Sequence, residues 1–376
     1  MEINQELLGR VRSEFIDGNL KDKNICIIHD TDCDGLTSAF LITKVLESVG
    51  AKPKLYITET SRDKFLDSEN MNKIREDNIN FIFVADIGLK GSNLMFQYEE
   101  LRSEGVKFMI FDHHEYSSEL SNKDSVYIHP ITLVGKEQAA YCTSKLVYDS
   151  LYAENNIADL KDYDWVYCTG MLGDMAFMDF KDEVLNIINK YEDNPVEINK
   201  TMEYYNTKIG KCIGMDIARS INQEAVHEVY KLLSNSKTPD ELIGALSEDG
   251  KISEAYHVVN YYLENFESMA EVTGDIIWVE IKEEYKLNSH ISTLISQSKP
   301  DHTFITYQKI GNVYGLSARR QDMTYSMRDL ISKCILGLRN ANGGGHIPAA
   351  GGRVAVEDFE TFKGRVLKHY EDFRIK

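Results

Sequence analysis

The sequence predicts an α/β protein with two domains and a helical connector between them. A length of 376 residues, 43% of them hydrophobic, is enough for two cores, because single cores seldom grow beyond about 250 to 300 residues. Short apolar runs alternate with helix-like segments towards both ends of the chain, which indicates a mainly parallel sheet flanked by helices. The middle of the chain has mostly helical periodicity.

The first domain is expected over residues 1–190. An apolar run at 24–29 precedes several Asp and Gly residues and then a helical pattern that ends at Gly50. This order predicts a strand, a loop and a helix. The same order recurs along the domain, with strands predicted at 54–58, 80–85 and 106–111 and a helix at 93–105.

The helical connector is expected over 191–272 and a smaller α/β domain over 273–376. The smaller domain has four strand-like runs and three helical segments, predicted at 275–281, 303–308, 312–318 and 352–356 for the strands and near 289–299, 324–334 and 358–370 for the helices. Its glycine-rich segment 342–346 is predicted to be a loop. We expect an active-site cleft between the two domains.

Charge and composition exclude several classes of protein. The formal charge of −18 opposes attraction of nucleic acid to the whole surface, so contact with a polyanion must be local, and the basic segment 315–353 is the candidate. No apolar run approaches the roughly 20 residues that span a bilayer, so we expect no membrane association and a cytoplasmic protein. Six cysteines without a C-x-x-C pair indicate buried free thiols.

Three acids follow the first predicted strand at alternate positions, Asp30, Asp32 and Asp34. Ligands of parallel α/β sheets bind at the carboxyl ends of the strands. A concentration of like charge there is costly without a cation, and hard oxygen-ligand metals such as Mg²⁺ or Mn²⁺ would relieve it. The alternative is an Asp-rich helix N-cap favoured by the helix dipole.

Two further predicted strands end in the same kind of residue. Asp86 follows one apolar strand, and Asp112-His113-His114 follows another. A single acid in this position is usually a turn former, and a lone pair of histidines is usually a solvated surface feature. Three such strand ends within 114 residues instead indicate side chains that converge on one edge of the sheet.

Asp174 is an acid within an otherwise apolar helical stretch. A buried carboxylate needs a partner or a metal, although a helix cap after Gly173 is the alternative. The combined set suits two-metal hydrolysis, in which the ions activate a water, orient the phosphate and stabilise the leaving oxygen. We expect two divalent ions, with Mn²⁺ favoured over Mg²⁺ because imidazole nitrogen prefers the softer ion.

In the smaller domain, Arg319 ends a predicted strand and Gly344, Gly345 and His346 lie in the glycine-rich segment. Glycine N–H groups and an arginine fork are suited to holding phosphate oxygens. A structural turn is the alternative explanation of the glycines. The presence of Arg319 and His346 in the same domain favours substrate binding.

These motifs, taken in order, resemble the DHH phosphoesterase superfamily. The Asp30/Asp32/Asp34-Gly35 segment resembles its first motif, Asp86 the second, Asp112-His113-His114 the third and Asp174 the fourth, and the glycine-histidine segment resembles the DHH-associated C-terminal domain. The resemblance implies two Mn²⁺ ions held by aspartates and His113, with Asp86 bridging. It also implies a positioning role for His114 and a phosphate- or nucleotide-holding role for Arg319 and His346.

The resemblance further implies a nuclease that digests single-stranded DNA or RNA, or short oligonucleotides, from an end and releases mononucleotides. One alternative is a phosphatase for a small phosphorylated metabolite, such as a nucleoside bisphosphate or polyphosphate. The other is a non-catalytic protein that binds nucleic acid or a replication partner. A homodimer is also considered.

Overall fold

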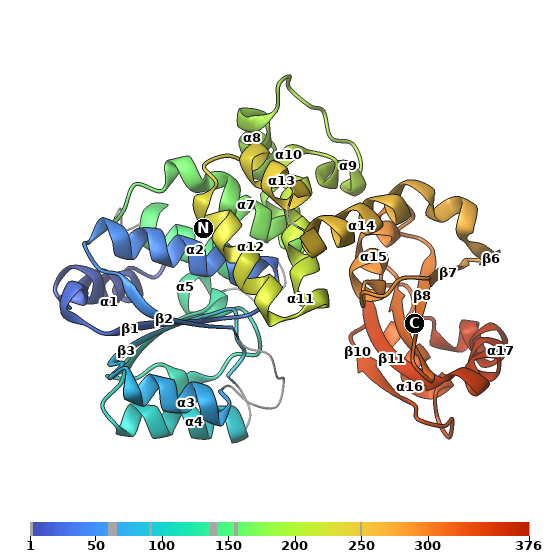
Figure 1. The fold of residues 1–376 in the computed structure, drawn as a ribbon, viewed down its shortest axis with the longest axis horizontal. Coiled ribbons are helices and arrows are strands. Elements are labelled where there is room, and N and C mark those ends of the chain that lie inside the picture. The colour runs from blue at the N-terminus through green and yellow to red at the C-terminus, as the bar shows by residue number, and fades with distance from the viewer. Residues whose placement is uncertain are drawn as a thin grey trace. The chain divides into compact units, whose positions relative to one another are not determined.

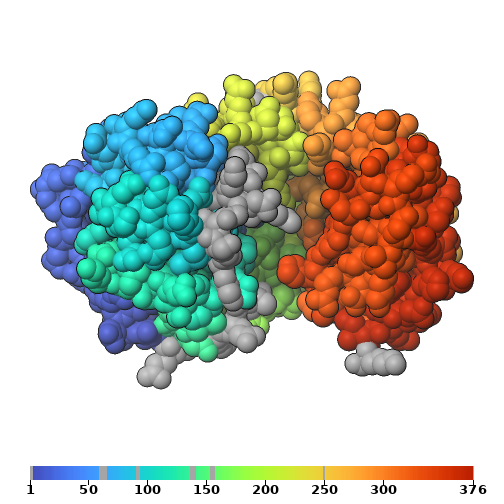
Figure 2. All heavy atoms as spheres, turned by 90° about the horizontal axis from the view of Figure 1, so that it is seen from below, coloured from blue at the N-terminus to red at the C-terminus, as the bar shows by residue number. Residues whose placement is uncertain are grey.

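The computed structural model describes residues 3–58, 66–89, 92–135, 141–153, 157–248 and 250–375. The chain forms two compact units. Unit 1 comprises Met1–Ile198 and Tyr204–Leu246, and unit 2 comprises Asn199–Glu203 and Ser247–Lys376. In Figure 1 the sheet of unit 1 is blue to green and that of unit 2 is orange to red, and Figure 2 shows the heavy atoms in the same colours. The predicted two-domain α/β class is confirmed.

Unit 1 contains a five-stranded sheet in which every neighbouring pair is parallel. The spatial order is β2-β1-β3-β4-β5, with bounds Pro53–Thr58, Ile25–His29, Phe81–Ala85, Lys107–Phe111 and Ser125–Ile128 respectively. The order reverses direction between β1 and β3, and ligands of such sheets bind at this switch point. Four of these strands were predicted, and β5 was not.

Helices cover both faces of this sheet, as Figure 1 shows. The face towards α3 (Ser68–Glu76) and α4 (Ser92–Ser103) buries alternate strand residues together with apolar residues of both helices. The opposite face lies towards α2 (Cys33–Ser48), nearly all of which is buried. Because both faces are covered, β1, β3 and β4 are mostly apolar and buried, and the functional side chains lie beyond their ends.

The rest of unit 1 is helical. It comprises α1 (Gln5–Ile16), α5 (Pro130–Val134), α6 (Thr143–Tyr148), α7 (Asp164–Gly173), α8 (Lys181–Tyr191), α10 (Lys208–Lys211), α11 (Ala218–Ile221), α12 (Gln223–Asn235) and α13 (Pro239–Glu248). α9 (Thr201–Tyr205) begins in unit 2 and ends in unit 1. α2 packs on α6, α7 and α12. Within the predicted connector 191–272, residues 204–246 therefore group with unit 1 and those after 246 with unit 2.

Unit 2 contains a six-stranded mixed sheet in the order β10-β11-β9-β8-β7-β6. Its strands are β6 (Glu271–Thr273), β7 (Ile276–Ile281), β8 (Thr303–Ile310), β9 (Val313–Arg319), β10 (Asn342–Gly345) and β11 (Ala349–Ala355), and its helices are α14 (Gly250–Met269), α15 (Asn288–Ile295), α16 (Met327–Cys334) and α17 (Phe359–His369). The core forms where α16 and α17 pack on the sheet through residues such as Leu330 and Phe362. No helix in the described part of the chain is long and apolar enough to cross a membrane.

The glycine-rich segment was predicted to be a loop, and this is wrong. Residues Asn342–Gly345 form the edge strand β10, which pairs antiparallel with β11. The glycines permit close approach, because a Cβ on Gly343 would lie 2.6 Å from Ile331 Cγ2 and 2.8 Å from the carbonyl oxygen of Gly351. Glycine inside a strand often marks such a contact between backbones.

All six cysteines are free thiols and all are buried, as the sequence predicts. Burial raises the pKa of Cys142 and of Cys168 well above the usual thiol range. These thiols therefore behave as small apolar side chains.

Candidate metal centre

Three strands of unit 1 deliver acids or histidines to one edge of the sheet. Asp30, Asp32 and Asp34 follow β1, Asp86 follows β3 at the switch point, and His113 follows β4. In the register of the sheet, the last residues of β1, β3 and β4 are direct neighbours: His29 pairs with Ala85, and Ala85 with Phe111. The predicted convergence is therefore a consequence of parallel pairing.

Asp34 lies in the first turn of α2 and is buried. Its two carboxylate oxygens accept backbone N–H bonds from the start of α6, at 2.7 Å from Thr143 and 2.9 Å from Ser144. Burial, together with the charge of Asp86, raises the pKa of Asp34 to about 6 against the opposing effects of His113 and Ser144. The two hydrogen bonds fix the position of the Asp34 carboxylate, but burial makes its negative charge unfavourable.

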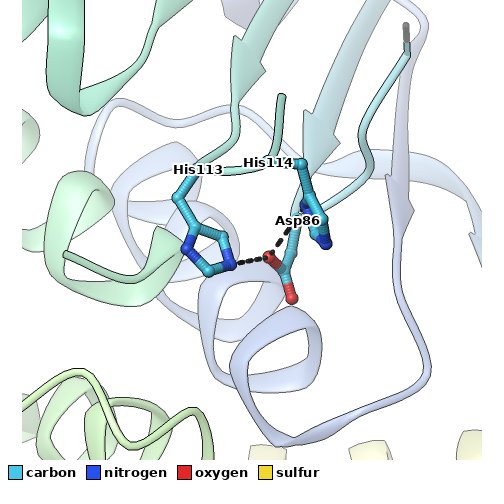
Figure 3. Close-up of side chains that lie close together, drawn as sticks. All are labelled: Asp86, His113 and His114. Carbon is cyan, nitrogen blue, oxygen red and sulfur yellow. Dashed lines mark ion pairs between the residues drawn. The ribbon is translucent and has the colours of Figure 1, made fainter. Parts of the chain in front are cut away.

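Asp86 is the central residue of the cluster and is 2% exposed. Its φ of 64° is left-handed, a conformation that Asp adopts more readily than most residues. In Figure 3 its carboxylate lies between the rings of His113 and His114, at 3.4 Å from His113 Nε2 and 3.9 Å from His114 Nδ1. Burial raises the pKa of Asp86, but the hydrogen bond and charge of His113, with the charge of His114, outweigh burial and hold it below the usual range.

His113 connects two carboxylates. Its Nε2 lies 3.4 Å from Asp86 Oδ1 and 3.4 Å from Asp174 Oδ2. Its Nδ1 is buried and accepts or donates no hydrogen bond within the described residues. Burial disfavours the charged ring, but Asp86 and Asp174 outweigh it and raise the pKa of His113 well above its ordinary value.

Asp112 and His114 form a pair beside the cluster. Asp112 is buried and its Oδ1 accepts from both the backbone N–H (3.2 Å) and Nδ1 (2.7 Å) of His114. Burial opposes protonation of His114, but the hydrogen bond and charge of Asp112 prevail and raise its pKa to about 9. Asp112 belongs to no group of candidate metal ligands among the described residues, so its position suits holding His114 in place.

Asp174 is the C-cap residue of α7 and lies beside His113. Its position at the end of the helix agrees with the helix-cap alternative, and 33% of its side chain is exposed. Neighbouring protein still excludes enough water to raise the pKa of Asp174 to about 7 despite the charge of His113, and Asp34 and Asp86 add to the rise.

Asp30 and Asp32 form a second acidic position with Asp86. Asp32 is the N-cap of α2 and accepts the N–H of Gly35 at 3.0 Å, so the N-cap alternative also holds for this residue. Burial and the charge of Asp86 raise the pKa of both Asp30 and Asp32. Buried Asp86 and the half-buried Asp30 and Asp32 leave a negative charge that capping alone does not neutralise.

Three groups of side-chain donor atoms lie close enough together that each could hold a metal ion. Ligand atoms within 4.8 Å of one another occur in three groups: Asp34, His113 and Asp174; Asp86, His113 and His114; and Asp30, Asp32 and Asp86. Carboxylate oxygens with one or two imidazole nitrogens suit Mn²⁺ or Mg²⁺. Burial and neighbouring acids raise the pKa of Asp34 and of Asp174, and a divalent cation held by these carboxylates and Nε2 of His113 would balance the excess negative charge.

The predicted substrate residues lie together within unit 2. Arg319 ends β9 opposite Ala349 of β11. The N–H of His346 donates to the carbonyl oxygen of Ala349 at 2.8 Å, and Gly344 and Gly345 lie exposed on β10. This hairpin therefore brings His346 and the glycines near the end of the strand that carries Arg319.

Four polar residues of the centre were not predicted from the sequence. Thr143 and Ser144 hold Asp34, and Asp216 accepts the N–H of Cys33 at 2.9 Å. Arg219 pairs with Asp216 and approaches Asp32. A Thr-Ser pair at a helix start and an Asp and Arg three residues apart are ordinary features of helical sequence, and neither signals a site.

The family model described as DHH family, N-terminal domain, matches residues 24–171, a range that contains all but one of the candidate metal ligands. Asp174 follows directly after it. No curated protein matches the sequence.

Among solved structures, the fold is similar to that of RecJ from Thermus thermophilus in complex with Mn²⁺, with a TM-score of 0.63 and 16% identity over 98% of this chain. The match covers 55% of the RecJ chain, so this chain spans about half its length. A structure of exonuclease RecJ bound to manganese has a TM-score of 0.62 and 15% identity, covering 97% of this chain and 94% of that one. CDC45 from Entamoeba histolytica has a TM-score of 0.52 and 9% identity, covering 97% and 98%.

At these identities the likeness concerns the fold, and the family match concerns the sequence. The two agree with each other and with the ordered motifs at the strand ends. Residues 24–171 match the DHH family, N-terminal domain, and the fold of the chain is similar to that of RecJ.

Proposed function

We propose that this protein hydrolyses phosphodiester bonds of single-stranded nucleic acid or short oligonucleotides from an end and releases mononucleotides, using two divalent cations. One observation carries the proposal. Asp34, Asp86, His113 and Asp174 come from four distant segments, yet their side chains meet at a single edge of the sheet. Structures of RecJ with Mn²⁺ and with Mg²⁺ support the type of cation.

Different residues of the centre would have different roles. Asp34, His113 and Asp174 would hold one cation and Asp30 and Asp32 the other, with Asp86 shared between them. Cations at such sites supply a water of lowered pKa and stabilise charge on the phosphate oxygens. His114, held by Asp112, presents a half-exposed ring of raised pKa beside the centre and is placed to bind a phosphate oxygen or donate a proton.

In unit 2, Arg319 and the β10–β11 hairpin would hold the substrate. An arginine fork binds phosphate through paired hydrogen bonds, and the exposed glycines permit backbone to approach it. The formal charge of −18 makes this local basic surface necessary, since the chain as a whole repels polyanions.

The test is a time course on single-stranded DNA and RNA of graded length, labelled at the 5′ or the 3′ end, with Mn²⁺ and the purified full chain. We expect mononucleotides from the first time points, and no product when a chelator is present. The Asp86→Asn variant should release none. Asp77→Asn is the matched control, because Asp77 is an acid that pairs with Lys54 on the surface, away from the centre.

Two other outcomes would contradict the proposal. Release of inorganic phosphate from small phosphorylated metabolites without mononucleotides from any strand would instead support a phosphatase. Binding of strands without any turnover in Mn²⁺ or Mg²⁺ would support a non-catalytic protein.

A further inference from the structure

Arg219 lies against the acids that follow β1. It belongs to α11, and its Nη1 is 3.8 Å from Asp32 Oδ2. Its Nη2 is 2.7 Å from Asp216 Oδ2. The other oxygen of Asp216 accepts the N–H of Cys33, a residue 183 positions earlier in the chain. The guanidinium is thus anchored beside the acidic position through a contact to the first turn of α2.

The ion pair with Asp216 limits how far the guanidinium of Arg219 can move away from Asp32. Asp216 is mostly buried and holds both Arg219 and the backbone next to Asp32. An unanchored surface arginine would turn into solvent when a cation arrived, at little cost. Arg219, with 39% of its side chain exposed, is instead held where a cation bound by Asp32 would encounter it.

The two candidate cation positions therefore differ in their electrostatic surroundings. Among the described residues, Asp32 forms an ion pair with an arginine, whereas Asp34, Asp86 and Asp174 form none with arginine or lysine. At the first position Asp34 accepts from two backbone N–H groups of α6, and the hydroxyl of Thr143 donates to the shared Asp86. The basic side chains that the described residues place beside these carboxylates are His113 and His114, which are themselves candidate ligands.

We propose that Arg219 sets the order in which two cations bind. The first occupies the position of Asp34, His113 and Asp174, and the second occupies the position of Asp30 and Asp32, where it competes with the fixed charge of Arg219. The second ion consequently binds more weakly, and its affinity is set by a helix outside the strand-end motifs. This inference rests on the two-cation centre of the proposed function.

The competition follows from Coulomb's law at short range. A fixed unit charge about 4 Å from a ligand oxygen acts on a divalent ion at that ligand with an energy of several RT even in a partly solvated site, and mobile water screens part of it. Removal of the charge should therefore tighten the weaker site by about tenfold. Among the described residues Arg219 forms no ion pair with Asp34 or Asp174, so the affinity of the first position should change by less than about twofold.

The experiment is a calorimetric titration of Mn²⁺ into the metal-free full chain, with electron paramagnetic resonance to count unbound Mn²⁺. Four proteins are compared: the unmodified chain, Arg219→Met, Arg219→Lys and Arg75→Met. Arg75 pairs with Glu100 and Glu104 on the surface of α3 and α4, so its substitution removes one positive charge without touching the centre. Thermal unfolding of each variant verifies that it is folded, and Arg219→Gln replaces Arg219→Met should that variant not fold.

We expect two unequal binding steps in the unmodified chain, a tightened weak step in Arg219→Met, and near-original values for Arg219→Lys and Arg75→Met. A single step, two equal steps, or a weak step that is unchanged or weakened in Arg219→Met overturns the inference. No nucleic acid is present in this measurement. A chain that binds ions as expected but releases no mononucleotides contradicts only the proposed function, and one that releases mononucleotides but binds two ions equally contradicts only this inference.

Discussion

The hydroxyl of Thr143 donates a hydrogen bond of 2.9 Å to Oδ1 of Asp86. The backbone N–H of the same residue donates to Asp34 Oδ2 at 2.7 Å. One residue at the start of α6 thus orients two carboxylates that arrive from different strands. Partners of this kind, which hold ligand side chains without touching the ion, often determine how well a metal site forms.

Replacement of Thr143 by Val should weaken Mn²⁺ binding by about 10- to 100-fold. The substitution keeps the shape and the backbone N–H but removes the donor to Asp86, so Asp34 stays held while Asp86 loses an orienting contact. Calorimetry measures the affinity. Thr143→Ser restores the hydroxyl and should recover most of it, and equal loss in both variants would show that packing rather than the hydrogen bond matters.

His113→Ala should lower turnover on oligonucleotides by several orders of magnitude while the chain remains folded. The ring lies 3.4 Å from both Asp86 and Asp174, so its loss removes a ligand nitrogen and brings two carboxylates together without a partner. Interactions made in the transition state affect turnover more than substrate binding. Steady-state rates with saturating Mn²⁺ provide the measurement.

His302→Ala is the matched control for that substitution, because His302 pairs with Asp301 on the surface of unit 2. It should retain full turnover. Activity of His113→Ala within tenfold of the unmodified chain would remove His113 from the catalytic centre.

The fold class could be predicted from the sequence because parallel strands buried on both faces are continuously apolar. β1, β3 and β4 have this pattern, and each is followed directly by an acid. Once the strands are parallel and adjacent, their carboxyl ends must lie side by side, so the meeting of Asp34, Asp86 and His113 follows from local patterns. Their roles as metal ligands stay a prediction.

The remaining parts of the centre depend on tertiary contacts that leave no local pattern. Thr143 and Arg219 are ordinary polar residues of helical segments, and only the packing of α6, α11 and α2 gives them partners. Similarly, the glycine-rich segment has the composition of a loop. It becomes strand β10 because β11 supplies a partner that the sequence of 342–345 does not indicate.

Affinity for Mn²⁺ should rise steeply between about pH 5.5 and 7.5 and continue to rise above that range, because His113, whose pKa is also raised, must lose its proton to bind a cation. The pKa is raised to about 6 for Asp34 and to about 7 for Asp174, so in the metal-free chain both carboxyl groups still hold protons below these values. Ligand groups must be deprotonated to bind a cation, so binding at pH 6 should release protons. Calorimetry in buffers of different ionisation enthalpy counts them.

These raised pKa values make the metal-free fold less stable as pH rises, whereas a salt-bridged acid makes a fold more stable as pH rises. Because the folded-state pKa of Asp34 lies above its unfolded value of 3.8, the metal-free fold binds an extra proton, and this contribution to stability is lost as pH rises through about 6. Asp174 acts in the same direction through about 7. Affinity that does not vary over this pH range would contradict the raised pKa values.

Gly170→Ala should displace the side chains that surround Asp34. A Cβ on this residue of α7 would lie 2.3 Å from Ser144 Oγ, 2.5 Å from Thr37 Oγ1 and 2.9 Å from Asp34 Oδ1, and all three neighbours are buried. Overpacking of this kind costs about 1 to 3 kcal/mol. Because the neighbours include Asp34 and the residue that holds it, Mn²⁺ affinity should fall as well.

Gly244→Ala is the matched control for Gly170→Ala. Gly244 also lies inside a helix, α13, but a Cβ there meets no atom within 4 Å. Alanine is favoured over glycine in a helix interior by up to about 1 kcal/mol, so this variant should be as stable as the unmodified chain or more so, with unchanged Mn²⁺ affinity. Chemical denaturation and calorimetry on both variants separate the two effects. If Gly170→Ala loses stability but binds Mn²⁺ normally, then α7 supports the fold without holding Asp34 in place.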